Sequence, residues 1–262
     1  MDNKIISYNN SRVKYIKKLL SSSKFRHKEK AFIIEGARLC ADAYKSGIEI
    51  VSLFYTLEAA KKYNKYLSDI LCHTDCELIS YDVLKHISST DSPQGIICIC
   101  KIPVQNMNLN TILACNKIIG LENIQDPSNL GTIIRTAEAL GIDRITISDG
   151  CCDLYNPKVL RGSMGAVFRV KCFNVNDYSY FIDVLNKNGF VTYASVPADD
   201  AFKINEINFN NKCAVFIGNE GNGLSKKTIC KCVKRITIPM NGRAESLNAA
   251  AAANIIMWEM VR

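Results

Sequence analysis

Short apolar segments that alternate with helical segments set the strongest limit on how this chain folds. Between residues 31 and 102 the segments AFIIEG, IEIVSLFYT, CELIS and GIICICKI are typical of strands, and helices are predicted between them at 37–47, 57–71 and 81–87. From residue 116 the alternation starts again with KIIGLENI and continues to the end of the chain. Strands that alternate with helices in this way predict an α/β fold.

The break in this alternation divides the chain into two domains, which is the usual outcome for 262 residues. The asparagine-rich stretch PVQNMNLNTILAC at 103–115 has the composition of a linker. We therefore predict a smaller N-terminal α/β domain at 1–102 and a second α/β domain at 116–262, the second with a mostly parallel sheet.

The net charge of +8 is concentrated near the N-terminus. Residues 1–30 hold nine Lys and Arg against two acidic residues, whereas the other 232 residues hold 24 basic and 23 acidic side chains. Residues 11–20 predict a helix with Val13, Ile16 and Leu20 on one face, and 21–30 predict a polar loop. Such a basic arm indicates nucleic acid or an anionic membrane surface as its partner, and a solvated, partly disordered tail is the alternative.

The twelve cysteines lie mostly inside apolar segments, such as Cys98 and Cys100 in GIICIC. This placement is typical of buried, reduced thiols and not of a disulfide framework. The Cys and His residues at 72–76 and 230–232 lack the paired spacing of a zinc site, so we expect no metal. No stretch reaches the roughly 18 apolar residues of a membrane span, and the N-terminus has no apolar signal region. We expect a cytoplasmic protein with no membrane partner.

Three predicted strands of the second domain are followed by segments rich in Asn, Gly, Ser and Arg. Ligands of an open α/β sheet bind at the carboxyl ends of its strands, so these segments form the candidate site. In NIQDPSNLGTIIRT, residues 123–136, Ser128 or Asn129 is expected to cap a helix that carries Arg135. A helix N-terminus and an arginine fork both favour an anion, although a capped helix with a surface arginine would leave the same pattern.

The second segment, FIGNEGNGL at 216–224, contains three glycines that permit close backbone approach. It lacks the Gly-Lys-Ser/Thr ending of a P-loop and the spacing of the dinucleotide-binding fingerprint. Glu220 would repel a phosphate. We therefore expect this segment to meet hydroxyl, amine or backbone N–H groups.

The third segment, IPMNGRAESLNAAAAANI at 238–255, sets Ser246 and Asn248 among apolar neighbours. Small polar groups between apolar walls predict a pocket for a mixed ligand, such as a nucleoside with a sulfur-containing tail. Five alanines follow. Alanine is the best helix former, but five together also predict a helix packed closely against neighbouring loops.

Together these segments resemble the SpoU (TrmH-type) family of RNA 2′-O-ribose methyltransferases, within the SPOUT superfamily. The matching stretches are NIQDPSNLGTIIRTAEALG, LRGSMGAVFR, FIGNEGNGLS and IPMNGRAESLNAAAAANI, in this order along the chain. KFRHKEKAFIIEGARLCADA and STDSPQGIICI resemble the family's N-terminal substrate-binding domain, which has a ribosomal-protein-like α/β fold. The resemblance extends over nearly the whole chain.

The resemblance implies a deep trefoil knot in the C-terminal domain, a homodimer formed through that domain, and S-adenosylmethionine as the methyl donor. Carried over by position, the residues expected to bind the donor are Gly218, Ile238, Leu247, Met240 and Glu220. The residues expected on the catalytic side are Arg135, Asn129, Ser246 and Asn248.

The chain offers no histidine base for this chemistry, because its three histidines all lie in the first domain. An arginine side chain stays protonated in proteins, which also makes Arg135 a poor base. We expect Arg135 to hold a substrate phosphate and stabilise the developing alkoxide, while Asn129 and Ser246 fix the ribose.

The resemblance makes RNA the expected partner, and ribosomal RNA of the 23S type is favoured because smaller tRNA-directed members lack an N-terminal domain of this kind. The residues expected to contact RNA phosphates are the basic side chains Lys14, Lys17, Lys18, Lys24, Arg26 and Lys28. The alternatives are a tRNA 2′-O-methyltransferase and a non-catalytic RNA-binding or assembly factor on the same fold.

Overall fold

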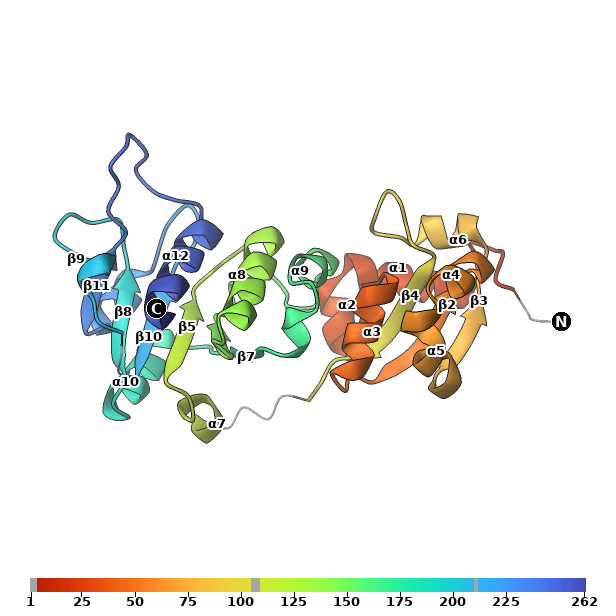
Figure 1. Ribbon diagram of the computed structural model, residues 1–262, viewed down its shortest axis with the longest axis horizontal. Helices are drawn as coiled ribbons and strands as arrows, with labels where there is room; N and C mark the ends of the chain where they lie inside the picture. Colours follow the sequence, from red (N-terminus) through yellow and green to blue (C-terminus); the bar gives the residue numbers. More distant parts are fainter. Residues whose placement is uncertain (1–3, 105–108, 210–211) are drawn as a thin grey trace. The chain divides into compact units, whose positions relative to one another are not determined.

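The computed structural model describes residues 4–104, 109–209 and 212–262, and it divides into two compact units (Figure 1). Unit 1 comprises Met1–Val104 together with Asp153–Phe168, and unit 2 comprises Gln105–Cys152 together with Arg169–Arg262. The segment 153–168 therefore packs with unit 1, although it belongs to the predicted domain 116–262. The predicted linker 103–115 includes residues 105–108, which lie outside the described residues. The predicted domain boundaries stay a prediction.

Unit 1 is built on a sheet with the strand order β1-β4-β2-β3 in its described part. Strand β4 pairs antiparallel with β1 and β2, while β2 and β3 are parallel. The strands are β1 (Ala31–Glu35), β2 (Ile50–Tyr55), β3 (Asp75–Leu78) and β4 (Ile96–Lys101). The helical segments are α1 (Ser11–Ser21), α2 (Ser23–Glu29), α3 (Ala37–Lys45), α4 (Leu57–Lys62), α5 (Asn64–His73), α6 (Tyr81–His86), α9 (Pro157–Gly162) and the 3₁₀ turn η1 (Ala166–Phe168).

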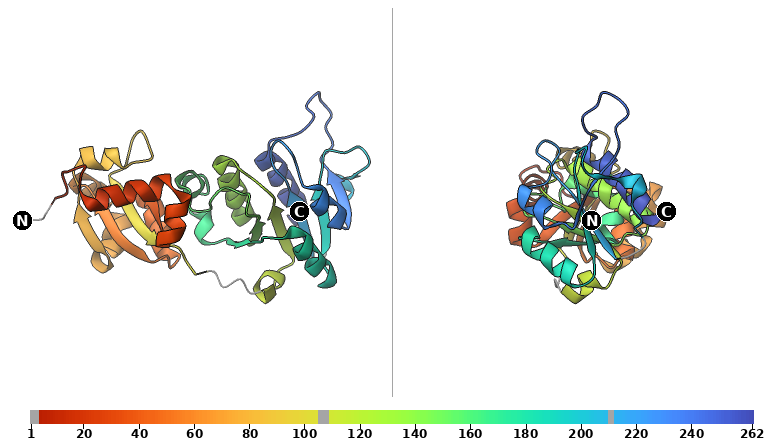
Figure 2. Two further views of the ribbon diagram at one scale, coloured as in Figure 1. Left: turned by 180° about the vertical axis from the view of Figure 1, so that it is seen from behind. Right: turned by 90° about the vertical axis from the view of Figure 1, so that its left-hand side faces the viewer.

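The basic N-terminal segment is folded against this sheet. Helix α1 buries Val13, Ile16 and Leu19 in a core shared with strand residues such as Ile33 and Phe54. Helices α1 and α2 both contact β1, and the rear view shows the two helices in front of the strands of unit 1 (Figure 2). The prediction of a helical face holds, with Leu19 in place of Leu20 as its last fully buried residue. The lysines of α1 lie on the opposite, exposed side.

Residues 21–30, predicted to be a loop, contain helix α2, so that prediction is wrong. Ser22 caps the helix by accepting a hydrogen bond from the Phe25 amide, and Lys30 ends it in the left-handed conformation. The buried face of α2 includes an arginine rather than a periodic row of apolar residues. The apolar pattern therefore did not reveal this helix.

Arg26 is that buried residue, with 3% of its surface exposed. Its Nε donates to Asp153 Oδ2 at 2.7 Å and its Nη1 donates to the carbonyl of Leu19 at 2.7 Å. Asp153 Oδ1 accepts a hydrogen bond from the Tyr155 amide at 3.0 Å, and it lies 3.4 Å from His27 Nε2. The pair thus ties α2 to the segment that leads into α9. A guanidinium held in this way is not available to a phosphate. We therefore no longer expect Arg26 to contact RNA, although it was among the residues predicted to do so.

One other predicted element differs in extent. The helix predicted at 57–71 is divided at Tyr63 into α4 and α5. The helix predicted at 81–87 is present as α6, and Ser80 caps it because its hydroxyl accepts from the Val83 amide at 3.4 Å.

Unit 2 is built on a sheet that has seven parallel strands among the described residues, in the order β7-β6-β5-β10-β8-β11-β9. The mostly parallel sheet is as predicted. The strands are β5 (Lys117–Leu121), β6 (Arg144–Ile147), β7 (Lys171–Asn174), β8 (Val191–Ser195), β9 (Phe202–Lys203), β10 (Cys213–Ile217) and β11 (Lys234–Thr237). The helical segments are α7 (Leu109–Leu113), α8 (Pro127–Ala139), α10 (Tyr178–Lys187), η2 (Ile204–Glu206), α11 (Lys226–Lys231) and α12 (Ala249–Val261).

The alanine-rich start of α12 packs closely against its neighbours. Ala249, Ala250 and Ala253 are buried, and the helix contacts both α8 and β10. Small side chains permit this close approach on the packed face of the helix. The loop that precedes α12, residues 238–248, extends away from the sheet in every view (Figures 1 and 2).

The twelve cysteines are all free thiols. Burial raises the pKa of Cys172 and of Cys232 to about 12, and that of Cys213 to about 11. These thiols are therefore protonated at neutral pH and act as packing residues. Every helix in the described part of the chain is too short or too polar to span a bilayer.

We predict that Arg26→Ala lowers the unfolding free energy of unit 1 by about 3 to 5 kcal/mol, because it leaves the Asp153 carboxylate buried without its partner. Hydrogen exchange of the β1 and β4 amides under native conditions measures this change. Lys24→Ala, an exposed position on the same helix, serves as the control and should change it by less than about 0.5 kcal/mol. Equal effects of the two substitutions would contradict a stabilising role for the buried pair.

Candidate functional site

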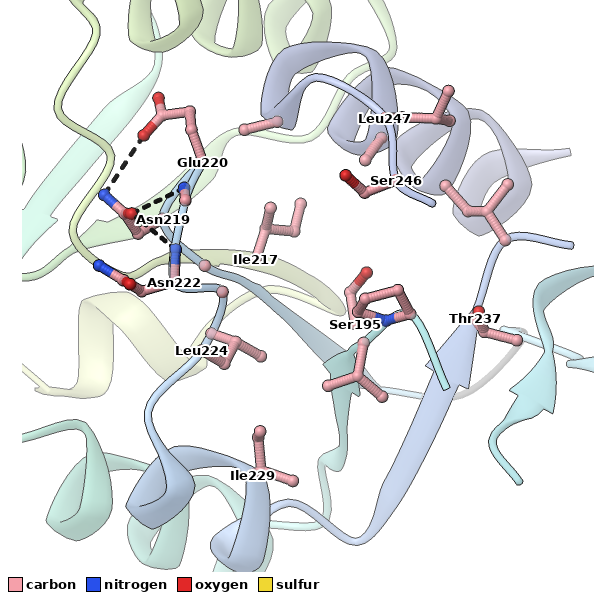
Figure 3. A pocket seen from close by; sticks show the side chains of 18 of the residues that line it. Ser195, Ile217, Asn219, Glu220, Asn222, Leu224, Ile229, Thr237, Ser246 and Leu247 are labelled. Atoms are coloured by element: carbon pink, nitrogen blue, oxygen red, sulfur yellow. Dashed lines mark hydrogen bonds between the residues drawn. The ribbon is translucent and has the colours of Figure 1, made fainter. Parts of the chain in front are cut away.

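A pocket of about 400 Å³ opens at the carboxyl ends of three neighbouring strands of unit 2 (Figure 3). Ser195, Ile217 and Thr237 are the last residues of β8, β10 and β11, and all three line the pocket. Loops after parallel strands meet at this edge of an α/β sheet, which makes it the usual position of a ligand site. The volume suits a small organic ligand.

The loop after β10 is a tight turn closed by its own hydrogen bonds. Asn219 exchanges backbone hydrogen bonds with Gly223, at 3.1 and 3.0 Å, and its side-chain oxygen accepts from the amides of Gly221 and Asn222 (Figure 3). The Asn219 side-chain nitrogen donates to the carbonyl of Asn123 at 2.8 Å, which joins this loop to the one after β5. The turn is thus held in one shape before any ligand binds.

Gly218 begins this turn where only a glycine fits. A Cβ atom at this position would lie 2.1 Å from the carbonyl carbon of Gly223 and 2.2 Å from the amide nitrogen of Leu224. Both atoms belong to the backbone and cannot rotate aside. The pocket wall formed by residues 218–224 therefore depends on this glycine.

A chain of side-chain hydrogen bonds connects the segments that follow β5, β10 and β11. The Asn248 side-chain oxygen caps α12 by accepting from the amides of Ala250 and Ala251, at 2.9 and 3.2 Å. Its nitrogen donates to Asn129 Oδ1 at 3.0 Å, and Asn129 Nδ2 donates to Glu220 Oε1 at 2.8 Å. Because backbone amides only donate, the orientation of each amide group along this chain is determined. The Glu220 carboxylate is the final acceptor.

The first loop differs in detail from the prediction. Asp126, and not Ser128 or Asn129, caps α8, because its carboxylate accepts from the Ser128 amide at 2.7 Å and Pro127 occupies the first turn. Asn129 is thereby turned inward, with 6% of its surface exposed, and its amide serves the hydrogen-bond chain. Arg135 lies on the exposed side of the same helix, and it is not among the residues that line the pocket.

Glu122 supports the wall of the pocket without lining it, and the sequence patterns did not reveal it. It follows β5, is buried, and accepts hydrogen bonds from the Ser225 amide at 2.9 Å and from Thr228 Oγ1 at 3.0 Å. It thereby holds the start of α11, which carries Ile229 into the pocket wall. Its position directly after an apolar strand is the signal that could have identified it.

The pocket carries little charge. Among the described residues that line it, Glu220 is the one ionisable side chain, and none is Lys or Arg. Hydroxyl groups of Ser195, Thr237 and Ser246 alternate with apolar walls that include Met240 and Leu247, each 36% exposed. This arrangement suits a ligand with apolar and hydrogen-bonding parts and a positive charge. It does not suit a triphosphate.

The structure brings most of the predicted residues together. All five residues predicted to bind the donor line the pocket, and Ser246 lines it with them. Asn129 and Asn248 are connected to Glu220 through hydrogen bonds. Lining residues outside the three segments chosen from the sequence come from the end of β8 and the residues after it, from α11 and from the end of β11, and they are Ser195, Val196, Pro197, Ile229 and Thr237.

The predicted RNA-contacting lysines lie apart from this pocket in the chain, on α1 and α2 of unit 1. Five of them are exposed, namely Lys14, Lys17, Lys18, Lys24 and Lys28. The part of the chain that the structure describes contains no group of three or more His, Cys, Asp or Glu side chains arranged to hold a metal ion.

Comparison with known proteins identifies the family. Residues 116–258 match the SpoU rRNA methylase family, and residues 10–98 match the MRM3-like substrate-binding domain. The chain belongs to the SpoU rRNA methylase family. It is 32% identical over 256 residues to the 23S rRNA (guanosine(2553)-2′-O)-methyltransferase RlmP of Bacillus subtilis, with 98% of each chain covered.

Solved structures of family members extend this similarity to the whole fold. The AdoMet-bound rRNA methyltransferase of Sinorhizobium meliloti is 26% identical, with a TM-score of 0.85 over 98% of this chain and 97% of that one. The SpoU methyltransferase AviRb of Streptomyces viridochromogenes, in complex with AdoMet, is 25% identical, with a TM-score of 0.84 over 97% of each chain. The α/β fold of this chain is therefore that of the SPOUT methyltransferases.

We predict that Gly218→Ala weakens the binding of S-adenosylmethionine at least about tenfold, because the backbone of residues 223–224 must move away from the added methyl group. Isothermal titration calorimetry measures the affinity. Gly242→Ala is the matched control, since an added Cβ there meets nothing within 4 Å. Unchanged affinity in Gly218→Ala would show that the tight turn is not part of the donor site.

Proposed function

We propose that this chain is an S-adenosylmethionine-dependent RNA 2′-O-ribose methyltransferase that acts on ribosomal RNA of the 23S type. The observation that carries this proposal is the pocket at the carboxyl ends of β8, β10 and β11. Asn129 of α8 joins Glu220, on the loop after β10, to Asn248, on the loop after β11. The relative that acts on 23S rRNA is similar to this chain over nearly its whole length. A non-catalytic RNA-binding factor would need neither the pocket nor the hydrogen-bond chain.

The residues of the pocket fit S-adenosylmethionine, which supplies an electrophilic methyl group on a positively charged sulfur. A pocket of about 400 Å³ with a single carboxylate and no cationic side chain among its described lining residues is electrostatically suited to that charge. Met240 and Leu247 offer apolar contacts, and the amides and carbonyls of the turn at 218–224 offer hydrogen bonds. We propose that Gly218, Ile238 and Glu220 complete the donor site.

We propose distinct roles for the residues on the catalytic side. Asn129 is buried and engaged at both ends of its amide, so we assign it the positioning of Glu220 and Asn248 rather than direct contact with the ribose. Ser246 lines the pocket and is exposed, which leaves its hydroxyl available to the ribose. Arg135 is exposed on α8, and its guanidinium can hold a substrate phosphate and stabilise the developing alkoxide.

Three further properties that we expect from the family resemblance are part of this proposal. A trefoil knot in unit 2 is supported by the position of β10 between β5 and β8 and by the packing of the last helix, α12, on α8. A homodimer formed through unit 2 is supported by Ile255 and Trp258, which are exposed on α12. A cytoplasmic location would match its ribosomal RNA substrate.

Two measurements test the proposed function. Calorimetry should detect binding of S-adenosylmethionine to the purified protein. Mapping of 2′-O-methyl groups in RNA from cells with and without the gene should show one or more ribosomal sites that are lost with the gene. Loss of a tRNA site alone would assign the alternative substrate, and donor binding without any lost site would contradict methyl transfer to RNA.

We predict that Arg135→Ala lowers kcat by about 10²-fold or more, because it removes a charge-stabilising donor, while donor affinity stays unchanged. Transfer of radiolabelled methyl groups to ribosomal RNA measures kcat. Arg135→Lys keeps the charge but loses the bidentate fork, so it should recover little of the rate. A nearly active lysine variant would refute the bidentate contact.

We predict that replacing Lys14, Lys17, Lys18, Lys24 and Lys28 together with Ser weakens RNA binding for all sequences and makes it less dependent on salt. Each lost phosphate contact should reduce the slope of log K against log [salt] by about 0.7 to 0.9. Fluorescence anisotropy at several salt concentrations measures the slope. An unchanged slope would show that these lysines are a solvated surface that does not contact RNA phosphates.

A further inference from the structure

A second hollow, of about 350 Å³, lies at the sheet edge of unit 2 formed by β9, and it is not part of the donor pocket. The residues that line it come from β9, α11 and β11 and the segments beside them, and they are Asp200, Phe202, Ile229, Cys230, Cys232, Val233, Lys234 and Arg235. Phe202 and Val233 are exposed by 52% and 57% of their surface. An aromatic ring this exposed at a sheet edge is available to stack on a planar ligand.

The described lining of the hollow contains two basic side chains and one acidic side chain. Lys234 and Arg235 are exposed, and Arg235 is paired with Asp200. Residues 226–243, which include α11 and β11, contain no Asp or Glu. Lys203 follows Phe202 on β9 and is exposed, but successive side chains of a strand point to opposite faces, and Lys203 is not among the lining residues. Lys234 is therefore the lining cation that can meet a polyanion.

The aromatic ring and the cations lie within reach of one another. The ammonium group of Lys234 is 5.3 Å from the centre of the Phe202 ring, and half of the ring surface is still exposed with Lys234 in this position. Strands β9 and β11 are parallel, and Phe202 is paired with Ile236 in the sheet. The combination of an exposed ring with adjacent cations is how proteins bind single-stranded nucleic acid, by stacking a base and neutralising its phosphate.

The hollow is separated from the donor pocket by one short helix. Ile229 of α11 lines both cavities. An RNA whose ribose is presented to the donor pocket must continue over the surrounding surface, because its neighbouring nucleotides are covalently attached. The surface beyond α11 is therefore placed to meet nucleotides that flank the target.

We propose that this hollow, with Phe202 and Lys234 as its principal residues, binds a single-stranded nucleotide of the substrate RNA that flanks the methylated one. The base stacks on Phe202, and a phosphate is neutralised by Lys234. The proposal rests on the RNA methyltransferase function, and it adds an RNA-binding surface in unit 2 to the one proposed for α1 and α2. A protein partner or a second copy of this chain is the competing occupant.

Binding of a fluorescein-labelled oligouridylate of about 12 nucleotides to the full chain tests the stacking contact. We expect Phe202→Leu to weaken its binding about tenfold, and Phe202→Trp to retain it. An abasic oligonucleotide of the same length should bind wild type and Phe202→Leu equally, because it has no base to stack. Equal loss with both probes, or no loss with either, would overturn the proposal.

The lysine contact is tested by the salt dependence of the same binding reaction. Lys234→Ser should reduce the slope of log K against log [salt] by about 0.7. Lys171→Ser, on β7 at the opposite edge of the sheet, and Tyr180→Leu, with an aromatic ring that is 70% exposed, are the matched controls and should leave the affinity for the oligonucleotide unchanged. If the controls weaken binding as much as Phe202→Leu and Lys234→Ser, RNA binds the charged surface without this site, and the proposal is overturned.

Two further readouts separate the competing explanations. Calorimetric binding of S-adenosylmethionine should be the same in wild type and Phe202→Leu, which shows that the unit is folded and the donor pocket intact. Sedimentation velocity should show the same mass for both proteins. A change in mass with unaltered oligonucleotide affinity would assign the hollow to a protein contact and overturn the proposal. If the wild type transfers no methyl group to any RNA, the proposed function fails, while the oligouridylate comparison still decides whether this surface binds RNA.

Discussion

The hydrogen-bond chain from the start of α12 through Asn248 and Asn129 to Glu220 is the interaction on which the site depends. It joins the segments that follow β5, β10 and β11, and two of its members, Asn129 and Asn248, are 119 positions apart in the sequence. Each amide in it has one possible orientation, because the chain begins at backbone N–H groups that can only donate. The loops are thereby held in register without a ligand, and preorganised groups of this kind lose little free energy to reorganisation during a reaction.

Close packing around that chain explains two sequence features that look unrelated. Gly218 has no room for a Cβ atom because the backbone of residues 223–224 crosses over it. The alanines at the start of α12 let this helix approach α8 and β10. In both places larger side chains would push apart the loops that the hydrogen bonds hold together. The alanine run therefore reflects a packing constraint on one face of the helix and helix propensity on the other.

Charge is distributed unevenly over the described residues. The lining of the pocket in unit 2 contains a single carboxylate, that of Glu220, whereas the lysines of α1 and α2 in unit 1 that we propose as RNA contacts are exposed. Arg26 is the exception within the basic segment, because it is buried and neutralised by Asp153. Its role is to hold α2 in place. A count of basic residues alone would have assigned it to RNA.

The sequence by itself determined the α/β class, the mostly parallel sheet and the family, and it singled out five residues that line the pocket of unit 2. Those features depend on local periodicity and on short motifs such as GNEG and ESLN, which are complete within a few residues. Only the tertiary structure decided the helix at 23–29, the cap at Asp126, the anchoring role of Glu122 and the inward position of Asn129. For α2, Glu122 and Asn129, the deciding contact joins residues that are about ninety positions or more apart in the sequence. Arg26 of α2 and its partner Asp153 are an example. A local sequence pattern cannot identify such a distant partner.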